Sequence, residues 1–257
     1  MMIQEKKVQK KQDPSNAFEL ECTTVWSFPD RGRWAGKSAS YRGNWAPQIP
    51  RNVILRYSKE GDTVLDPMVG SGTTLVECAI TNRRGIGYDI NAKVVALAKE
   101  NIKLSGVNGT HPLTAQQGDA RNLKDIASES VDLVLTHPPY VDIVKYSEDL
   151  EGDISLIHDV GKFCIEINKV AKECLRVLKP DHYCAILIGD TRRKQHYIPV
   201  AFRVMEEFLK AGFVLKEDVI KQQHNCRATH YWASQSKRFN FLLIMHEHLF
   251  VFRKPCL

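Results

Sequence analysis

The sequence predicts a doubly wound α/β fold built on a mostly parallel sheet of seven strands. Short apolar runs of strand length alternate with longer segments whose apolar residues recur at helical spacing. Such alternation implies right-handed crossover connections and a sheet that helices cover on both faces. Ligands of such sheets bind at the carboxyl ends of the strands, so residues at these ends are the first candidates for function.

Three strands expected in the first half of the chain each lead to an acidic residue, namely Asp66, Asp89 and Asp119. Pro50 suits the first turn of a helix, and Asn91 suits the cap of another. The expected elements are a helix at 50–57, a strand at 63–65, a helix at 73–81, a strand at 85–89, a helix from Ala92 and a strand at 114–117.

The second half continues the alternation. The expected elements are a strand at 131–135, a helix at 155–177, a strand at 183–188, a helix at 200–211 and a strand at 213–220. Pro180 ends the first of these helices, and Gly212 ends the second. The last strand falls within residues 239–252, where the pattern does not rank the apolar halves 239–245 and 249–252.

Composition and charge exclude several classes of protein. The hydrophobic fraction of 43% is normal for a folded globular chain, and no apolar run is long enough to cross a membrane. The Lys-rich N-terminus lacks the apolar stretch of a secretory signal. The seven cysteines are scattered without a Cys-x-x-Cys pair, which favours a reducing, cytoplasmic location. The net charge of +6 suits a polyanionic partner without establishing one.

A glycine-rich loop, Gly70-Ser71-Gly72, joins the strand that ends at Asp66 to the next helix and leaves backbone N–H groups free to face a ligand. A dinucleotide fingerprint would need a third glycine where this chain has Leu75, so a phosphate-binding loop is disfavoured. Asp89 is placed to accept both hydroxyls of a ribose, and Asp119 to accept from an adenine amino group. A cationic adenosine compound without phosphates, S-adenosylmethionine, fits this pattern.

The segment from Asp66 to Thr74 resembles the cofactor motif of S-adenosylmethionine-dependent DNA amino-methyltransferases, typically Asp-Pro-Phe-x-Gly-Ser-Gly-Thr-Thr. Residues 43–59 look like the preceding motif of those enzymes, and residues 246–254 look like their last strand. The resemblance implies the class I methyltransferase sheet, with residues 1–42 as an extension packing on the core and residues 43–257 as a catalytic domain with short target-recognition loops. The cofactor-binding residues that it implies are Asp66, Pro67, Gly70, Gly72, Thr73, Thr74, Asp89 and Asp119.

A second motif, Thr136-His137-Pro138-Pro139-Tyr140, follows the fourth expected strand and resembles the catalytic motif of the same enzymes, usually Ser, Asn or Asp before Pro-Pro-Tyr. An exocyclic amine is a weak nucleophile because its lone pair is conjugated with the ring. The resemblance implies that His137 and the Pro138 carbonyl accept hydrogen bonds from this amine, that Pro139 helps to hold the backbone rigid, and that Tyr140 stacks on a flipped-out base.

His137 departs from the family pattern. A neutral imidazole accepts one hydrogen bond, whereas a protonated imidazole accepts none. The chain is therefore a working variant, an enzyme with altered substrate choice, or a disabled enzyme. Methylation of cytosine carbon-5 is disfavoured, because it needs a Pro-Cys pair at this position and the chain has that pair only at Pro255-Cys256.

Two polar segments are expected to contact DNA. Residues 191–197 follow a strand end, and residues 221–238 mix cations with aromatic side chains. The candidate nucleic-acid contacts are Arg192, Arg193, Lys194, Arg227, Trp232 and Lys237. No metal site is expected, because His224, Cys226 and His230 lack a fourth ligand, and the His246 and His248 pair fits a structural role better.

The expected activity is methylation of an exocyclic amine in DNA. Thr136 and the Gly-Ser-Gly-Thr-Thr loop favour cytosine N4 over adenine N6, although the order of the two motifs differs from the permuted order common in the cytosine group. RNA guanine-N2 or protein glutamine methylation and a non-catalytic nucleic-acid-binding subunit are the alternatives. DNA is the expected partner, a cognate restriction endonuclease is left open, no membrane is expected, and the sequence does not indicate the oligomeric state.

Overall fold

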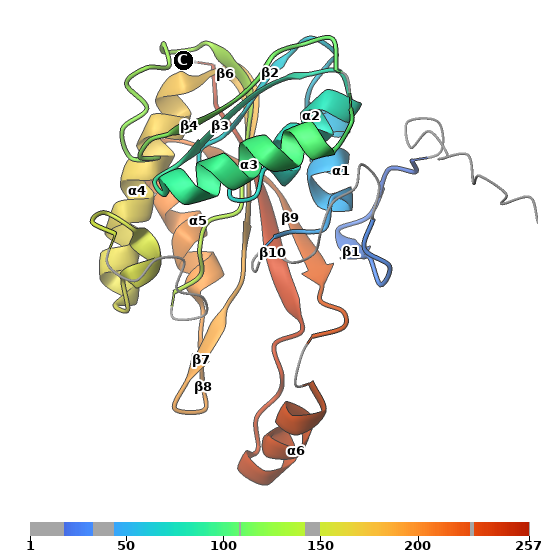
Figure 1. Ribbon diagram of the computed structural model, residues 1–257. Coiled ribbons are helices and arrows are strands. Elements are labelled where there is room, and N and C mark those ends of the chain that lie inside the picture. Colours follow the sequence, from blue (N-terminus) through green and yellow to red (C-terminus); the bar gives the residue numbers. More distant parts are fainter. Residues whose placement is uncertain (1–17, 33–43, 108, 142–149, 227–228, 257) are drawn as a thin grey trace, which may run out of the picture.

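The computed structural model describes residues 18–32, 44–107, 109–141, 150–226 and 229–256 (Figure 1). The strands are β1 (Val25–Ser27), β2 (Thr63–Asp66), β3 (Arg84–Asp89), β4 (Leu113–Gln117), β5 (Val131–Thr136), β6 (Leu178–Ile188), β7 (Thr191–Arg193), β8 (His196–Ile198), β9 (Val214–Gln222) and β10 (His246–Arg253). The helices are α1 (Gln48–Tyr57), α2 (Thr73–Ile80), α3 (Ala92–Leu104), α4 (Val160–Val177), α5 (Val200–Ala211) and α6 (Thr229–Phe239), with a short 3-10 helix, η2 (Ile154–Leu156).

One large sheet organises these elements in the order β1-β9-β10-β6-β5-β2-β3-β4. Strands β6, β5, β2, β3 and β4 pair in parallel, and β10 is antiparallel to both of its neighbours. The predicted α/β fold with a mostly parallel sheet is therefore confirmed. The sheet has eight strands rather than seven, because β1 pairs in parallel with the edge strand β9. This strand has three residues, which are too few to show an alternating pattern.

Helices cover both faces of the sheet (Figure 1). Neighbouring residues of β2 contribute to different apolar clusters, because side chains alternate between the faces of a strand. Val64 packs with α1 residues such as Ile49, whereas Leu65 belongs to the cluster that contains α4 and α5. Helix α2 packs between α1 and α3 and contacts both. The apolar core therefore lies between the sheet and the helices on each face, and the ends of the strands are left uncovered.

The element boundaries follow local capping. The Asn91 side chain accepts from the Lys93 N–H at 3.0 Å and starts α3, as the sequence predicts. The helix expected from residue 155 starts only at Val160, because Asp159 caps it and η2 precedes it. Strand β6 begins at Leu178, five residues before the expected position, because Leu178 pairs with Val131 of β5.

The last strand, β10, contains the second of the two apolar halves that the sequence left unranked. Most of the first half follows α6, a helix in the polar segment that was expected to contact DNA. In Figure 1, α6 and the β7–β8 hairpin project together beyond one edge of the sheet. Across the part of the chain that the structure describes, none of the helices is both long and apolar enough to cross a bilayer.

Candidate active site

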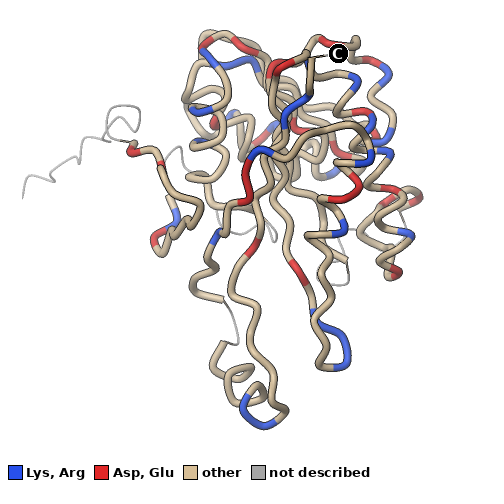
Figure 2. The backbone as a smooth tube through the Cα atoms, turned by 180° about the vertical axis from the view of Figure 1, so that it is seen from behind, with Lys and Arg blue, Asp and Glu red and all other residues tan. Residues whose placement is uncertain are grey.

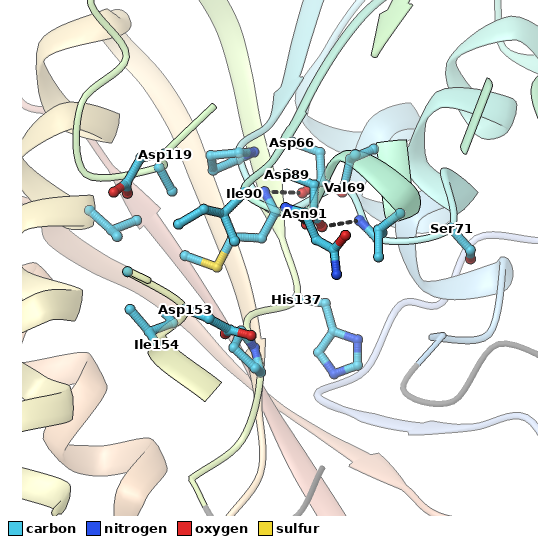
Figure 3. A pocket seen from close by; sticks show the side chains of 18 of the residues that line it. Asp66, Val69, Ser71, Asp89, Ile90, Asn91, Asp119, His137, Asp153 and Ile154 are labelled. Carbon is cyan, nitrogen blue, oxygen red and sulfur yellow. Dashed lines mark hydrogen bonds between the residues drawn. The ribbon is translucent and has the colours of Figure 1, made fainter. Parts of the chain in front are cut away.

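A pocket of about 850 Å³, including its open mouth, lies at the carboxyl ends of β2, β3, β4 and β5 (Figure 3). Its wall contains both sequence motifs, since the loop after β2 and the residues after β5 line it together. In Figure 3, Asp119 and His137 lie toward different ends of the pocket, with Asp89 between them. The predicted site residues that line the pocket are Asp66, Pro67, Gly70, Asp89, Asp119, His137 and Pro139.

Asp66 holds the glycine loop in shape. Its carboxyl group accepts from the Thr74 hydroxyl at 2.5 Å and from the Met68 N–H at 3.1 Å. Burial raises the pKa of Asp66 to about 7, although the Thr74 and Met68 hydrogen bonds oppose the rise. Gly72 has φ 85°, and a Cβ there would lie 3.2 Å from the Ala98 Cβ, so α3 can pack closely only on a glycine. Thr74 and Gly72 thus shape the loop from behind the pocket wall.

Asp89 ends β3 with its carboxyl group in the pocket wall. One oxygen accepts from the Gly70 N–H at 3.2 Å and the other from the Asn91 N–H at 2.9 Å, which fixes the plane of the group. Burial raises the pKa of Asp89 despite these two bonds. The carboxyl group is positioned before any ligand arrives, and each oxygen has further lone-pair capacity for a hydroxyl donor.

Asp119 is paired more strongly than the sequence suggests. Arg121 donates to both of its oxygens from Nε at 2.9 and 3.0 Å, and from a terminal nitrogen at 2.6 Å. Arg121 also reaches Glu166 at 2.5 Å and the Gly152 carbonyl at 2.9 Å. Burial raises the pKa of Asp119, but the Arg121 guanidinium outweighs burial and holds this pKa below its usual range. The Asp119 carboxylate is therefore already paired with Arg121 before a ligand binds.

The charges of the wall fit a cation better than a phosphate. Four carboxyl groups line it, from Asp66, Asp89, Asp119 and Asp153, and the one Lys or Arg among the described lining residues is Arg121. Such a wall repels a pyrophosphate and attracts a positive charge. Apolar side chains complete the wall. S-adenosylmethionine carries a positive sulfonium and no phosphate, so these residues fit it.

The His137 ring is held on two sides. Trp45, a buried residue just before α1, stacks on it with ring centroids 5.4 Å apart and planes 20° apart. The Tyr140 ring meets it edge-on at 5.2 Å, and the His137 Nε2 atom lies 2.6 Å from the Tyr140 hydroxyl oxygen. Tyr140 in turn fits against Gly189, where a Cβ would lie 3.1 Å from the ring. His137 and Tyr140 thus form one rigid unit at the end of β5.

Glu247 of β10 holds this unit in place through Tyr140 and does not itself line the pocket. The Tyr140 hydroxyl donates to Glu247 Oε1, and the Lys221 ammonium of β9 lies 2.7 Å from Oε2. Glu247 is only 6% exposed. Burial raises the pKa of its carboxyl group, but Lys221 and the Tyr140 hydrogen bond together hold that pKa below its usual range. The carboxylate is therefore an ionised acceptor inside the protein.

This chain of contacts assigns the proton on His137. A tyrosine hydroxyl has one hydrogen, and here Glu247 receives it. The Tyr140 oxygen must then accept the hydrogen carried by His137 Nε2. In the neutral imidazole, Nδ1 is consequently the nitrogen that can accept a hydrogen bond. A neutral His137 in place of the usual Ser, Asn or Asp would thus keep an acceptor in the motif.

The sequence analysis did not identify Glu247, Lys221 or Trp45 as site residues. Glu247 stands in an otherwise apolar strand, which is the sequence signal that could have singled it out. Its pairing with Tyr140 joins residues far apart in the chain, so spacing could not reveal it. Trp45 falls in the segment whose resemblance to a family motif covers residues 43–59.

The predicted nucleic-acid contacts that the structure describes lie on the two projections, and blue segments mark the ends of both in Figure 2. Lys194 is exposed at the turn of the hairpin, and Trp232 and Lys237 are exposed on α6. Arg192 donates to the carbonyls of Gln195 at 2.6 Å and Leu242 at 2.9 Å, so it joins the hairpin to the segment after α6. Arg193 donates to the His158 carbonyl. Arg227 lies outside the described residues.

Together with the family match given below, the parallel sheet and the acidic pocket identify a class I methyltransferase that uses S-adenosylmethionine. Its fold is similar to that of an S-adenosylmethionine-dependent methyltransferase from Methanosarcina mazei, with a TM-score of 0.55 and 16% identity over 80% of this chain and 98% of that chain. The chain belongs to the DNA methylase family, whose profile matches residues 1–100 and 131–256. The profile of an RMKL-like methyltransferase domain also matches, over residues 53–154. The predicted family and cofactor are confirmed.

Two curated relatives match part of this chain. The chain is 34% identical over 101 residues to the tRNA (guanine(10)-N2)-dimethyltransferase of Methanothermobacter thermautotrophicus, which is 39% of this chain and 29% of that protein. It is 40% identical over 81 residues to the Type II methyltransferase M.HpaI of Haemophilus parainfluenzae, which is 31% of this chain and 26% of that protein. The chain thus spans less than a third of the length of either relative.

Proposed function

We propose that this chain transfers a methyl group from S-adenosylmethionine to an exocyclic amine of a base in DNA, with cytosine N4 favoured over adenine N6. One observation carries the proposal: the Pro-Pro-Tyr motif and the acidic cofactor pocket share a wall at His137. When bound, the cofactor supplies an electrophilic methyl group. The protein residues then have to bind the amine, orient its lone pair and keep the geometry fixed.

In this proposal, the His137 ring and the Pro138 carbonyl accept the two N–H groups of the target amine. Accepting both hydrogens draws the nitrogen lone pair out of conjugation with the base. The anchored Tyr140 hydroxyl supplies the orientation, because it holds Nε2 and leaves Nδ1 as the accepting nitrogen of the neutral ring. Preorganisation of this kind lowers the barrier, since no reorganisation is left for the transfer step.

The cofactor roles follow the same logic. Asp89 is proposed to accept the ribose hydroxyls, because its carboxyl group is oriented by Gly70 and Asn91 and faces the pocket. Asp119 is proposed to meet the adenine amino group at the other end, together with Arg121. Pro67 and Gly70 line the wall between them. Gly72, Thr73 and Thr74 shape the loop rather than touch the ligand.

The hairpin β7–β8 and helix α6 are proposed to bind DNA as a pair of prongs. No described residue of α6 is buried, and Tyr231 and Trp232 are 59% and 50% exposed. A helix without a fully buried residue that presents exposed aromatics together with Lys237 suits a nucleic-acid partner. The target base must leave the duplex to reach a recessed pocket, and the prongs would hold the backbone meanwhile.

The Lys194 backbone supports a role for the hairpin tip. Lys194 and Gln195 have φ of 46° and 69°, a conformation that glycine and asparagine adopt with less strain. Placing other residues there costs about 1–2 kcal/mol each. A charged side chain is thereby kept at the tip of the projection at the expense of local stability, as expected of a binding element.

The remaining assignments rest on the resemblance. We propose residues 1–42 as an extension and residues 43–257 as the catalytic domain. Arg31 of this extension donates to the carbonyls of Asn44 at 2.8 Å and Trp45 at 2.7 Å, and thereby helps to hold the ring that stacks on His137. A cognate restriction endonuclease as partner and a cytoplasmic location are part of the same proposal.

RNA guanine-N2 methylation is the second candidate function, because the tRNA-modifying relative matches this chain in part. Labelled S-adenosylmethionine incubated with duplex DNA, transfer RNA and protein extract distinguishes the two. Label in DNA is the expected result, and nucleoside analysis then decides between cytosine and adenine. Label confined to RNA or protein would replace the proposal. Cofactor binding without label in any substrate would indicate a non-catalytic subunit.

A further inference from the structure

A second cluster of chemically active side chains lies outside the cofactor pocket. Asp190 follows β6, and His246 and His248 stand at the start of β10; one ligand atom from each lies within 4.8 Å of the others. His246 and His248 share a face of β10, while Glu247 between them points to the other face. We propose that these three residues bind a divalent transition-metal ion, with Zn²⁺ as the ion that the donors fit best.

His248 is already oriented as a metal ligand. Its Nδ1 lies 3.0 Å from Asp218 Oδ1, so the ring donates this hydrogen to a carboxylate and keeps a lone pair on Nε2. Nε2 is buried and has no hydrogen-bond partner among the described residues. A carboxylate that holds the far nitrogen of a ligating histidine is a recurrent feature of zinc sites, because it fixes the ring and raises its basicity.

The gap in front of Nε2 has the size that an ion needs. The distance between Asp190 Oδ2 and His248 Nε2 is 3.7 Å, which is too long for a hydrogen bond. Two ligand atoms each about 2.1 Å from a tetrahedral zinc ion lie about 3.4 Å apart. An unprotonated Nε2 and a carboxylate oxygen both present lone pairs to this gap, so a cation between them removes their repulsion and satisfies both.

The Asp190 carboxylate is also held in place. The Tyr197 hydroxyl donates to Oδ2, and the Ala201 N–H at the start of α5 donates to Oδ1 at 2.8 Å. Asp190 is 6% exposed and His248 is 4% exposed, so neither can turn to solvent instead. The His248 ring is stacked on Phe250 with planes 14° apart. Little reorganisation is therefore needed for these two ligands to bind an ion.

His246 supplies the third donor from the half-buried side of the cluster, with its ring centroid 5.3 Å from that of His248. Two imidazoles and one carboxylate are typical ligands of zinc and of neighbouring first-row metals. The sequence analysis assigned these two histidines a structural role, and it could not associate Asp190 with them because that residue is distant in the chain. The ion would join β10 to the turn after β6, directly beside Glu247, which anchors Tyr140.

The test uses the metal-stripped full chain, titrated with Zn²⁺ by calorimetry and with Co²⁺ by visible absorption. We expect one ion per chain, a Co²⁺ spectrum of a site with nitrogen and oxygen ligands, and a higher melting temperature. His246→Gln removes a half-buried ligand and should weaken Zn²⁺ binding on the order of 100-fold; Asp218→Asn, which acts through His248, should weaken it about 10- to 100-fold.

His230→Gln is the matched control. His230 is exposed on α6 and belongs to the rival His224, Cys226 and His230 group, so this variant should bind Zn²⁺ as the wild type does. Binding that His246→Gln leaves unchanged, or that His230→Gln abolishes, would overturn the assignment. The absence of Zn²⁺ binding by the wild type would also overturn it.

Discussion

The Glu247→Gln substitution isolates the proposed anchor of the catalytic motif. Gln keeps the size and shape of the side chain but removes the charge that both Tyr140 and Lys221 contact. A hydrogen bond to a buried charged group contributes about 1.5–3 kcal/mol. If this orientation is used mainly in the transition state, kcat falls about 10- to 100-fold, since each 1.4 kcal/mol corresponds to a factor of ten. The free energy of unfolding should also fall by about 1–3 kcal/mol because Lys221 loses its partner.

A double-mutant cycle with Tyr140→Phe measures the contact itself. Labelled S-adenosylmethionine and duplex DNA give kcat, calorimetry gives the cofactor dissociation constant, and chemical denaturation gives stability. In the Tyr140→Phe background, Glu247→Gln should cost little further activity, because the shared hydrogen bond is already gone. Cofactor affinity should stay within about twofold in all variants, since Glu247 does not line the cofactor pocket. Equal losses in both backgrounds, or an unchanged kcat in the single variant, would refute the anchoring role.

Three further predictions concern the cofactor pocket and the prongs. Tyr140→Ala should lower kcat far more than cofactor affinity, while Asp89→Ala should do the reverse; calorimetry and methyl transfer separate them, and equal losses of affinity would contradict both roles. Because burial raises the pKa of Asp66 to about 7, the wild type should lose up to about 4 kcal/mol of stability as pH rises from 4 to 7. In Asp66→Asn, the free energy of unfolding measured by denaturation should change less between pH 4 and 7. An unchanged dependence on pH would argue against a buried, raised-pKa Asp66. Lys237→Ala should weaken DNA binding for all sequences and reduce the salt slope by about one, whereas Lys99→Ala, on the exposed face of α3, should not.

The strands and helices that bury regular patterns could be predicted from the sequence. The positions of β2, β3, β5 and α5 follow from short apolar runs and from one amphipathic helix ended by Gly212. The exceptions have little local signal. Strand β1 owes its existence to pairing with β9, and α6 buries none of its described residues. A three-residue strand and a helix that buries no residue lack the pattern of buried positions that would distinguish them from loops.

The grouping of the acidic residues in one pocket could be predicted because its parts are local. Parallel strands bring their carboxyl ends to one edge, so Asp66, Asp89 and Asp119 are expected together from the strand assignments alone. What each carboxyl group contacts could not be predicted in this way. Asp66 turned out to hold Thr74, and Asp119 is shared with Arg121, because these bonds depend on side-chain directions that only packing sets.

The sequence by itself determined the α/β fold, the S-adenosylmethionine family and the two motifs at the strand ends, because each is encoded in residues near one another in the chain. Only the tertiary structure decided what holds His137 and Tyr140 in place. Glu247 and Lys221 come from β10 and β9, and they reach Tyr140 because β10 runs antiparallel between β6 and β9. The same antiparallel strand brings His248 to Asp190. Contacts of this kind depend on strand order and register, which pair residues without regard to their separation along the chain.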